Sequence, residues 1–168
     1  FHVLANSDSE ADQTLKLAVR DRVLREYGDL LEACTSKEET LAALKNAQQE
    51  ISETAEAEVL AQGYAYPVRV SLVREEFPFK KYGDLIFPAG VYDALRIEIG
   101  EAKGKNWWCV LYPQMCYVDA AWGYSTEESH VRLQNTLTKE EFLVVSAMEQ
   151  KKITPKIKCR LVELWSER

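Results

Sequence analysis

The sequence lacks the features that would point to a membrane, nucleic-acid or metal-dependent role. No apolar run reaches the roughly 18 residues that a membrane-spanning helix needs. With 21 Lys and Arg against 27 Asp and Glu, the net charge of −6 provides no basic field of the kind that attracts nucleic acid. The four cysteines lack the close pairs that structural zinc sites use. We therefore expect no nucleic-acid partner and no metal.

Catalytic motifs are absent as well. Only His2 and His130 are available as bases for a nucleophile, and neither stands in a recognisable motif such as HExxH or GxSxG. The segment GEAKGKN, residues 100–106, has one residue too few between its glycines for a phosphate-binding loop, and no Ser or Thr follows its lysine. The sequence thus predicts a non-catalytic protein with no cofactor and no small-molecule substrate.

What the sequence does contain is hydrophobic periodicity typical of one α+β domain over residues 1–168. Alternation of apolar and polar residues predicts five strands, over residues 1–5, 66–76, 91–99, 107–112 and 156–161. Helical spacing predicts three helices, over residues 9–31, 36–63 and 138–152. The prediction is a roughly five-stranded antiparallel or mixed sheet with about three helices packed on it.

Three local predictions can be compared directly with a structure. The first helix should bury a stripe formed by Leu15, Val19, Val23, Tyr27 and Leu30. The strands over 91–99 and 107–112 should form a hairpin, because the polar, glycine-punctuated segment between them turns the chain back. Residues 119–135 show no clear period, and we expect an ordered loop there.

Helix-start chemistry is clear at three places. Ser7 or Ser9 can cap the first helix, and Ser36 with Glu39 forms a capping box for the second. Thr138 opens the third helix in the same way, with Glu141 three residues later. The six acidic residues of the second helix most simply form a solvated face.

Three stretches resemble a known family. They are FHVLANSDSEADQTLKLAVRD at residues 1–21, YGDLIFPAGVYDALRIEIG at residues 82–100, and GKNWWCVLYPQMCYVD at residues 104–119. Together they resemble stage II sporulation protein R, a family of exported signalling proteins from endospore-forming bacteria. The resemblance implies that the chain activates a membrane-embedded aspartic protease, which then processes the pro-sigma-E precursor. It implies no catalytic residue.

The resemblance also implies a location. The protein would be exported to the space between the forespore and mother-cell membranes. Because the chain starts at Phe1 without Met, we expect an N-terminal signal or anchor segment to be missing from it.

Candidate contacts with the protease cluster in the third stretch. Trp107 and Trp108 must point to opposite sides of a strand, so at most one belongs to the main core and the other is a candidate interface residue. The alternative for the outer tryptophan is a second small core. The full set is Lys105, Asn106, Trp107, Trp108, Pro113, Gln114 and Met115, together with Asn6 and Asp8 if the polar turn at 6–9 is presented to a partner rather than serving as a cap alone.

In an exported protein, Cys109 and Cys116 are a candidate disulfide pair, since the segment between them contains Pro113 and can turn back. Two buried thiols are the alternative. Cys34 and Cys159 are a second possible pair, and the sequence alone does not fix the connectivity.

Two other classes of function compete with a protein ligand. A peptidoglycan-binding module of the cell wall would also use exposed tryptophans. A wall-modifying enzyme would need a carboxylate pair or metal cluster in a cleft, whereas the acidic residues here lie mainly on one helix. Neither class explains a likeness that runs along the whole chain.

Overall fold

The computed structural model describes residues 1–82, 85–112 and 127–146, and the chain forms two compact units. The first unit comprises Phe1–Val73 and Asp93–Tyr117, and the second comprises Arg74–Tyr92 and Val118–Arg168. Each unit is taken by itself below. The expectation of one domain over 1–168 stays a prediction.

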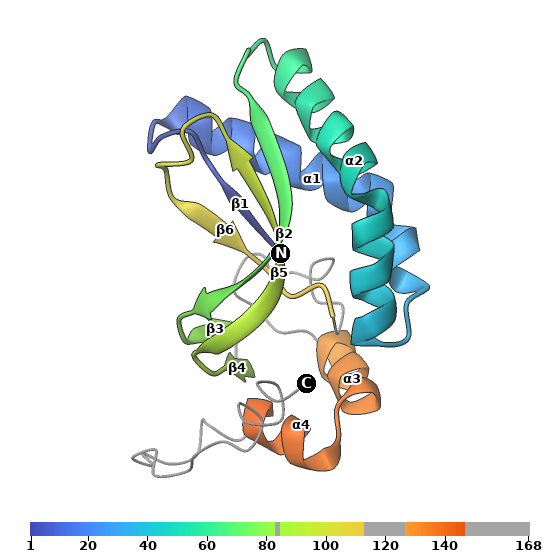
Figure 1. The fold of residues 1–168 in the computed structure, drawn as a ribbon. Helices are drawn as coiled ribbons and strands as arrows, with labels where there is room; N and C mark the ends of the chain where they lie inside the picture. The colour runs from blue at the N-terminus through green and yellow to red at the C-terminus, as the bar shows by residue number, and fades with distance from the viewer. Residues whose placement is uncertain (83–84, 113–126, 147–168) are drawn as a thin grey trace. The chain divides into compact units, whose positions relative to one another are not determined.

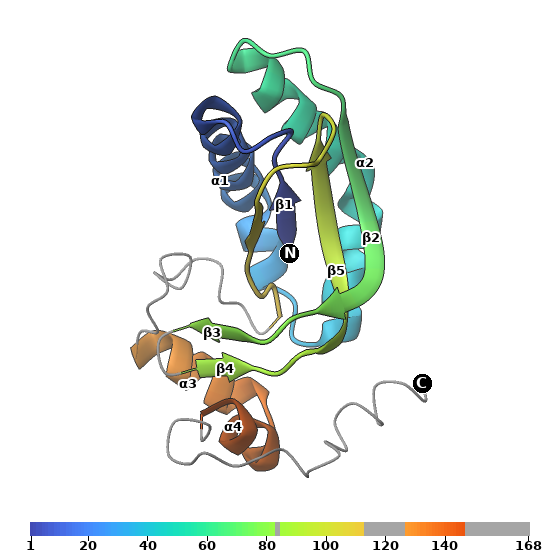
Figure 2. The same cartoon turned by 90° about the vertical axis from the view of Figure 1, so that its left-hand side faces the viewer.

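The first unit is built on a four-stranded mixed sheet with the strand order β2-β5-β1-β6 (Figures 1 and 2). β1 runs parallel to β5 and antiparallel to β6. Helices α1 and α2 pack on one face of this sheet. The bounds of these elements are β1 His2–Leu4, α1 Glu10–Glu32, α2 Lys37–Ala61, β2 Val68–Phe77, β5 Gly90–Ile99 and β6 Asn106–Trp108. The α+β prediction is confirmed, with four strands in this sheet rather than five.

Both long helices begin where the sequence predicts. The Ser9 hydroxyl accepts a hydrogen bond from Asp12 N at 3.2 Å, and the Ser36 hydroxyl accepts one from Glu39 N at 3.1 Å. The Glu39 carboxylate reaches back to accept from Thr35 N at 2.7 Å, which completes a reciprocal cap. These bonds satisfy amide donors that have no partner inside the helix.

The core lies between the sheet and the two helices. Val3, Val19, Ile51, Ile97 and Ile99 have no exposed side-chain surface. Apolar alternation on β1 and β5 meets the helical stripes here, so burial of these side chains drives the packing of the first unit.

The predicted stripe of the first helix is correct except at its end. Leu30 is 43% exposed, whereas Leu31 is 4% exposed. The four-residue steps that lead from Leu15 to Tyr27 continue to Leu31, so Leu30 falls off the buried face.

The predicted hairpin is wrong. β5 and β6 do not pair with each other, because β1 lies between them: Val3 is opposite Ile97 on one side and Trp107 on the other. The segment after β5 does turn back, but it runs past the end of β1, where its backbone hydrogen-bonds to the residues that follow β1. β5 and β6 are therefore separated by the width of one strand, and β1 occupies that position. Alternation predicted both strands, although β6 ends at Trp108 rather than at residue 112, and it could not reveal that the chain's first strand lies between them.

The second unit contains a separate two-stranded antiparallel sheet, β3 (Lys80–Tyr82) with β4 (Leu85–Phe87), and helices α3 (Glu127–Thr136) and α4 (Lys139–Ser146). The prediction of a loop over 119–135 is wrong from Glu127 onward. This helix has only ten residues, fewer than the about 11 or more over which helical periodicity becomes distinct, and within it Leu133 is fully buried whereas Val131 is 51% exposed. α4 begins after Thr138, as predicted, and Phe142 N donates to Thr138 O at 2.9 Å. The predicted strand over 156–161 lies outside the described residues.

Candidate functional site

Two segments far apart in the sequence meet at one end of β1, and together they form a turn–loop junction. The junction consists of the turn at residues 6–8 and the loop at residues 100–106. Four backbone N–H groups of the loop donate to the turn or to the residue before it: Gly104 N to Ala5 O at 2.9 Å, Lys103 N to Asn6 O at 3.2 Å, Glu101 N to Asn6 Oδ1 at 2.9 Å, and Lys105 N to Asp8 Oδ1 at 2.6 Å. The loop conformation is therefore fixed by the N-terminal turn.

Both glycines of the loop are needed for this close approach. Gly100 has φ +61°, and a Cβ there would overlap the side-chain oxygen of Asn6. A Cβ on Gly104 would overlap the carbonyl oxygen of Ser7, a backbone atom with little freedom to move. The glycines that superficially suggested a phosphate-binding loop instead allow the backbone of the loop to lie against the turn.

The buried carboxylate of Asp12, in the first turn of α1, hydrogen-bonds to the side chains of the turn at residues 6–8. Asp12 is 4% exposed and accepts hydrogen bonds from Ser7 Oγ and from Asn6 Nδ2, the latter at 2.9 Å. These bonds favour the charged form, so they hold the pKa of the Asp12 carboxyl below its ordinary value. The polar side chains of the turn are thus engaged in internal bonds. Their role as partner contacts stays a prediction.

A buried lysine joins α1 to the loop. Lys16 is 5% exposed, and its Nζ donates to Gln13 Oε1 at 2.6 Å and to Lys105 O at 3.0 Å. Burial, with Arg20 nearby, lowers the pKa of the Lys16 amine. Sequence reasoning missed this residue, because a lysine within a helix is usually solvated and no local pattern marks its distant acceptor.

The two tryptophans lie on opposite faces of the sheet, as alternation predicts. The ring of Trp107 packs edge-on against Phe1 with centroids 5.8 Å apart, and the Arg20 guanidinium lies 4.8 Å from its centroid. Trp107 therefore belongs to the main core, on the side of Val3. Trp108 lies on the other face, stacked on His2 at 4.8 Å and 10°.

His2 is a residue of this second face that the sequence analysis did not single out. It is 2% exposed, and its Nδ1 lies 2.8 Å from Asn106 Nδ2. Burial, reinforced by the positive charges of the Phe1 amine and of Arg96, lowers the pKa of His2 to about 3. Alternation with Phe1 and Val3 places His2 on the opposite face of its strand, but no local signal could have placed it beside Trp108, because that contact depends on the pairing of β1 with β6.

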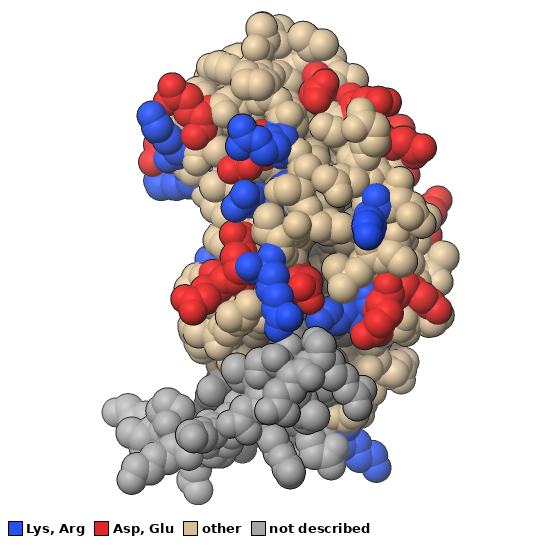
Figure 3. Space-filling view, in the orientation of Figure 1, with Lys and Arg blue, Asp and Glu red and all other residues tan. Residues whose placement is uncertain are grey.

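The rest of this second face carries paired charges. The Glu98 carboxylate lies 3.3 Å from Arg69 and 3.6 Å from Arg96. Figure 3, which shows one side of the molecule, has Lys and Arg interspersed with Asp and Glu rather than gathered in a patch of one sign. Nothing here resembles an electrostatic footprint for a polyanion.

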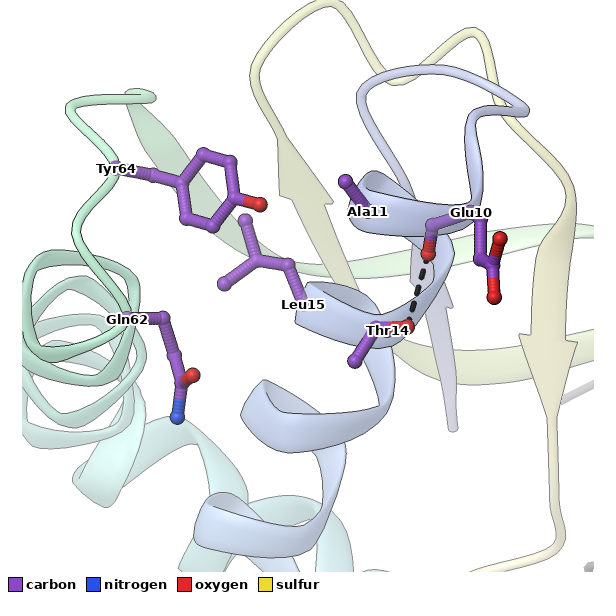
Figure 4. Close-up of a pocket in the computed structure, with 6 residues that line it drawn as sticks. All are labelled: Glu10, Ala11, Thr14, Leu15, Gln62 and Tyr64. Atoms are coloured by element: carbon purple, nitrogen blue, oxygen red, sulfur yellow. Dashed lines mark hydrogen bonds between the residues drawn. The ribbon is translucent and has the colours of Figure 1, made fainter.

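An open hollow of about 470 Å³ lies where α1 meets the end of α2 (Figure 4). It is lined by Glu10, Ala11, Thr14, Leu15, Gln62 and Tyr64. The Thr14 hydroxyl donates to Glu10 O at 2.9 Å, so it is engaged within its own helix. The lining contains neither a nucleophile with an adjacent base nor a pair of carboxylates, which gives this hollow no recognisable catalytic chemistry.

The structure brings four of the predicted contact residues together. Asn6, Asp8, Lys105 and Asn106 all belong to the turn–loop junction, and Trp108 follows it directly on β6. Pro113, Gln114 and Met115 lie outside the described residues.

Both candidate cysteine pairs include a residue that lies outside the described part of the chain. Cys109 is 8% exposed, and its pairing with Cys116 stays a prediction because Cys116 lies outside the described residues. The second possible pair, Cys34 with Cys159, also stays a prediction, because Cys159 lies outside the described residues; in the structure Cys34 is a free thiol whose Sγ lies 3.4 Å from Leu30 O, one helical turn back.

Within residues 1–82, 85–112 and 127–146, no three His, Cys, Asp or Glu residues lie close enough together to hold a metal ion. None of the helices in this part of the chain is both long enough and apolar enough to cross a membrane.

Comparison with known proteins gives one consistent result. The family model described as stage II sporulation protein R matches residues 1–122. The stage II sporulation protein R of Bacillus subtilis (strain 168) is 33% identical over 177 residues, an alignment that covers 99% of this chain and 79% of that protein. No solved structure matches.

Proposed function

The chain belongs to the stage II sporulation protein R family, and on that premise we propose that it is an exported signal that activates a membrane-embedded aspartic protease. Activation would lead to processing of the pro-sigma-E precursor. The observation that carries the proposal is the likeness to the Bacillus subtilis protein over 99% of the chain. The protein would act in the space between the forespore and mother-cell membranes, without chemistry of its own.

The turn–loop junction and Trp108 are the surface proposed to meet the protease. The loop is held by four backbone hydrogen bonds, while the side chains of Glu101, Lys103 and Lys105 are exposed. A surface that is already ordered loses less conformational entropy on binding, so more of the contact energy appears as affinity.

Activation by binding alone is physically sufficient. If the active site of the protease is assembled from two copies, a weak dimer would leave it inactive. A ligand that binds the assembled form more tightly shifts the population toward it, by no more than the difference between its two affinities. This scheme assigns the protein the role of a ligand and requires no nucleophile, base or metal from it.

A Cys109–Cys116 disulfide is part of this proposal. An exported protein meets an oxidising environment, and a bridge across residues 109–116 would restrict the segment that follows β6. Cys109 is disulfide-bonded rather than a free thiol, which supports the pairing.

The test is cleavage of the sigma-factor precursor in a non-sporulating host that makes the membrane protease. The domain is either exported to the extracytoplasmic side of the protease or omitted. Cleavage that appears only with the exported domain supports the proposal. Absence of cleavage, with both proteins folded and correctly placed, would overturn direct activation and favour binding to peptidoglycan, which a pull-down on purified cell wall measures.

A further inference from the structure

Lys105 is held at both ends of its backbone. Its N–H donates to Asp8 Oδ1 at 2.6 Å, and its carbonyl accepts from Lys16 Nζ at 3.0 Å. Asp8 belongs to the turn and Lys16 to α1, so two different elements fix one loop residue. Because Lys16 is buried, water does not compete for its Nζ–H groups. Breaking the hydrogen bond to Lys105 O would leave a buried donor without that acceptor, so the bond is favoured.

The side chain of Lys105 is exposed, in contrast to its fixed backbone. Its ammonium has no ion pair or hydrogen bond with any residue in the described part of the chain. Lys103, two residues earlier on the same loop, is also exposed, but its Nζ lies 2.8 Å from Glu101 Oε2. The loop therefore carries one paired cation, Lys103, and one unpaired cation, Lys105.

Two further basic residues lie near Lys105. Arg20 and Lys105 both disfavour the charged form of the buried Lys16 and so lower its pKa, whereas Asp8 favours that form. Arg20 is itself paired with Asp21 at 2.6 Å. The chain as a whole carries a net charge of −6, so the exposed ammonium of Lys105 is a local point of attraction for an anionic group on a partner.

We propose that Lys105 is a preorganised anchor for a carboxylate of the protein partner, and that Asp8 and Lys16 are the positioning residues that hold it. The inference rests on the proposed function and specifies the chemistry of the contact: an Asp or Glu on the extracytoplasmic side of the membrane protease. An exposed lysine normally loses side-chain and backbone freedom when it binds. Here the backbone part has already been lost on folding.

The test compares variants of the exported domain in the precursor-cleavage assay. Lys105→Glu is expected to reduce activation by about tenfold or more, as close interfacial charge pairs do, and Lys105→Arg is expected to retain most of it. Lys45→Glu, on an exposed position of α2 outside the junction, is the matched control and is expected to change activation by less than about twofold, because it makes the same charge change away from the proposed contact surface. Thermal unfolding of each purified variant verifies the fold.

The positioning role has its own readout. Asp8→Ala removes the acceptor for Lys105 N, so activation is expected to fall although the Lys105 side chain is intact. Asp8→Asn keeps an acceptor oxygen and is expected to restore activation. If Asp8→Ala and Asp8→Asn lose activation equally, the backbone bond is not what matters and the positioning role is wrong.

A charge reversal identifies the partner group. Changing the contacted carboxylate of the protease to lysine is expected to restore activation by Lys105→Glu. A different result is that wild-type protein co-sediments with phosphatidylglycerol vesicles, Lys105→Glu does not, and no protease variant restores activation. That outcome would show that Lys105 contacts a lipid phosphate rather than a carboxylate of the protease, and it would overturn the inference.

The failures are distinguishable. If wild-type protein produces no cleavage, the proposed function is wrong and the inference falls with it. If wild-type protein and Lys105→Glu activate equally, the function stands and the inference alone is wrong.

Discussion

The buried His2 makes the stability of the protein depend on pH in a defined window. The folded state keeps the imidazole neutral down to a pKa of about 3, whereas the unfolded chain protonates it near 6.5. Between these values the unfolded state binds more protons, so stability falls as the pH falls from about 6.5 toward 3. Replacing His2 with glutamine, which cannot be protonated but can still hydrogen-bond to Asn106, should remove this contribution.

The expected size follows from the two pKa values. For a single group with folded and unfolded pKa values of about 3 and 6.5, the free energy of unfolding should drop by about 1.9 kcal/mol between pH 7 and pH 5. The His2→Gln variant starts from a lower stability, because stacking on Trp108 is lost, and it should lose about 1.9 kcal/mol less than wild type over the same interval.

Urea unfolding followed by tryptophan fluorescence measures the free energy of unfolding of wild type and of His2→Gln, each at pH 7 and at pH 5. His130 and every carboxyl group are present in both proteins, so their contributions cancel in the difference of differences. If wild type and variant lose the same stability within about 0.5 kcal/mol, then His2 is not held neutral in the folded protein. The account of its burial against Trp108 and Arg96 would then be wrong.

Three further predictions concern the junction and the residues beside it. Gly104→Ala should destabilise the protein by about 1–3 kcal/mol in urea unfolding, because its Cβ would overlap Ser7 O and the loop must shift; an unchanged midpoint would contradict the packing. Under oxidising conditions, Cys109→Ser should lower the free energy of unfolding by about 2–5 kcal/mol, whereas Cys34→Ser should lower it by less than about 0.5 kcal/mol. Titration of free thiols in each variant verifies which cysteine is free. Trp107→Ala should lower the free energy of unfolding by about 3 kcal/mol, because the indole packs against the core. If the variant were as stable as wild type, the indole would not contribute to the core.

The elements that the sequence predicted well are those whose signals are local. Ser9 and Ser36 mark helix starts through oxygens that bond to amides three residues ahead, and the strand over 91–99 alternates clearly from Leu95 to Ile99. Leu30 was misplaced by one position because periodicity locates a buried face only to within a residue at the helix end. Helix α3 was missed because its ten residues are too few for helical periodicity to stand out from the sequence around them.

The order of the strands depends on long-range pairing that no local pattern encodes. Nothing in the composition of residues 1–5 indicates that they pair with residues 96–98 and 106–108, yet this pairing shapes the candidate site. The clustering of Asn6 and Asp8 with Lys105 could not be foreseen from spacing, and neither could the buried bond from Lys16. The residue types were recognised as candidates, and their contacts had to come from the fold.

The central place of β1 has a consequence for how the chain folds. β1 pairs with β5 on one side and with β6 on the other, and both partners lie about a hundred positions later in the chain. Neither pairing can form until most of the first unit has been synthesised. Contacts of such high sequence separation slow folding, since the entropy of closing a long loop must be overcome first. Among the described strands of this sheet, the only neighbours that lie close together in sequence are β2 and β5. Deleting the first five residues would divide the sheet in two, whereas removing an outer strand would only narrow it.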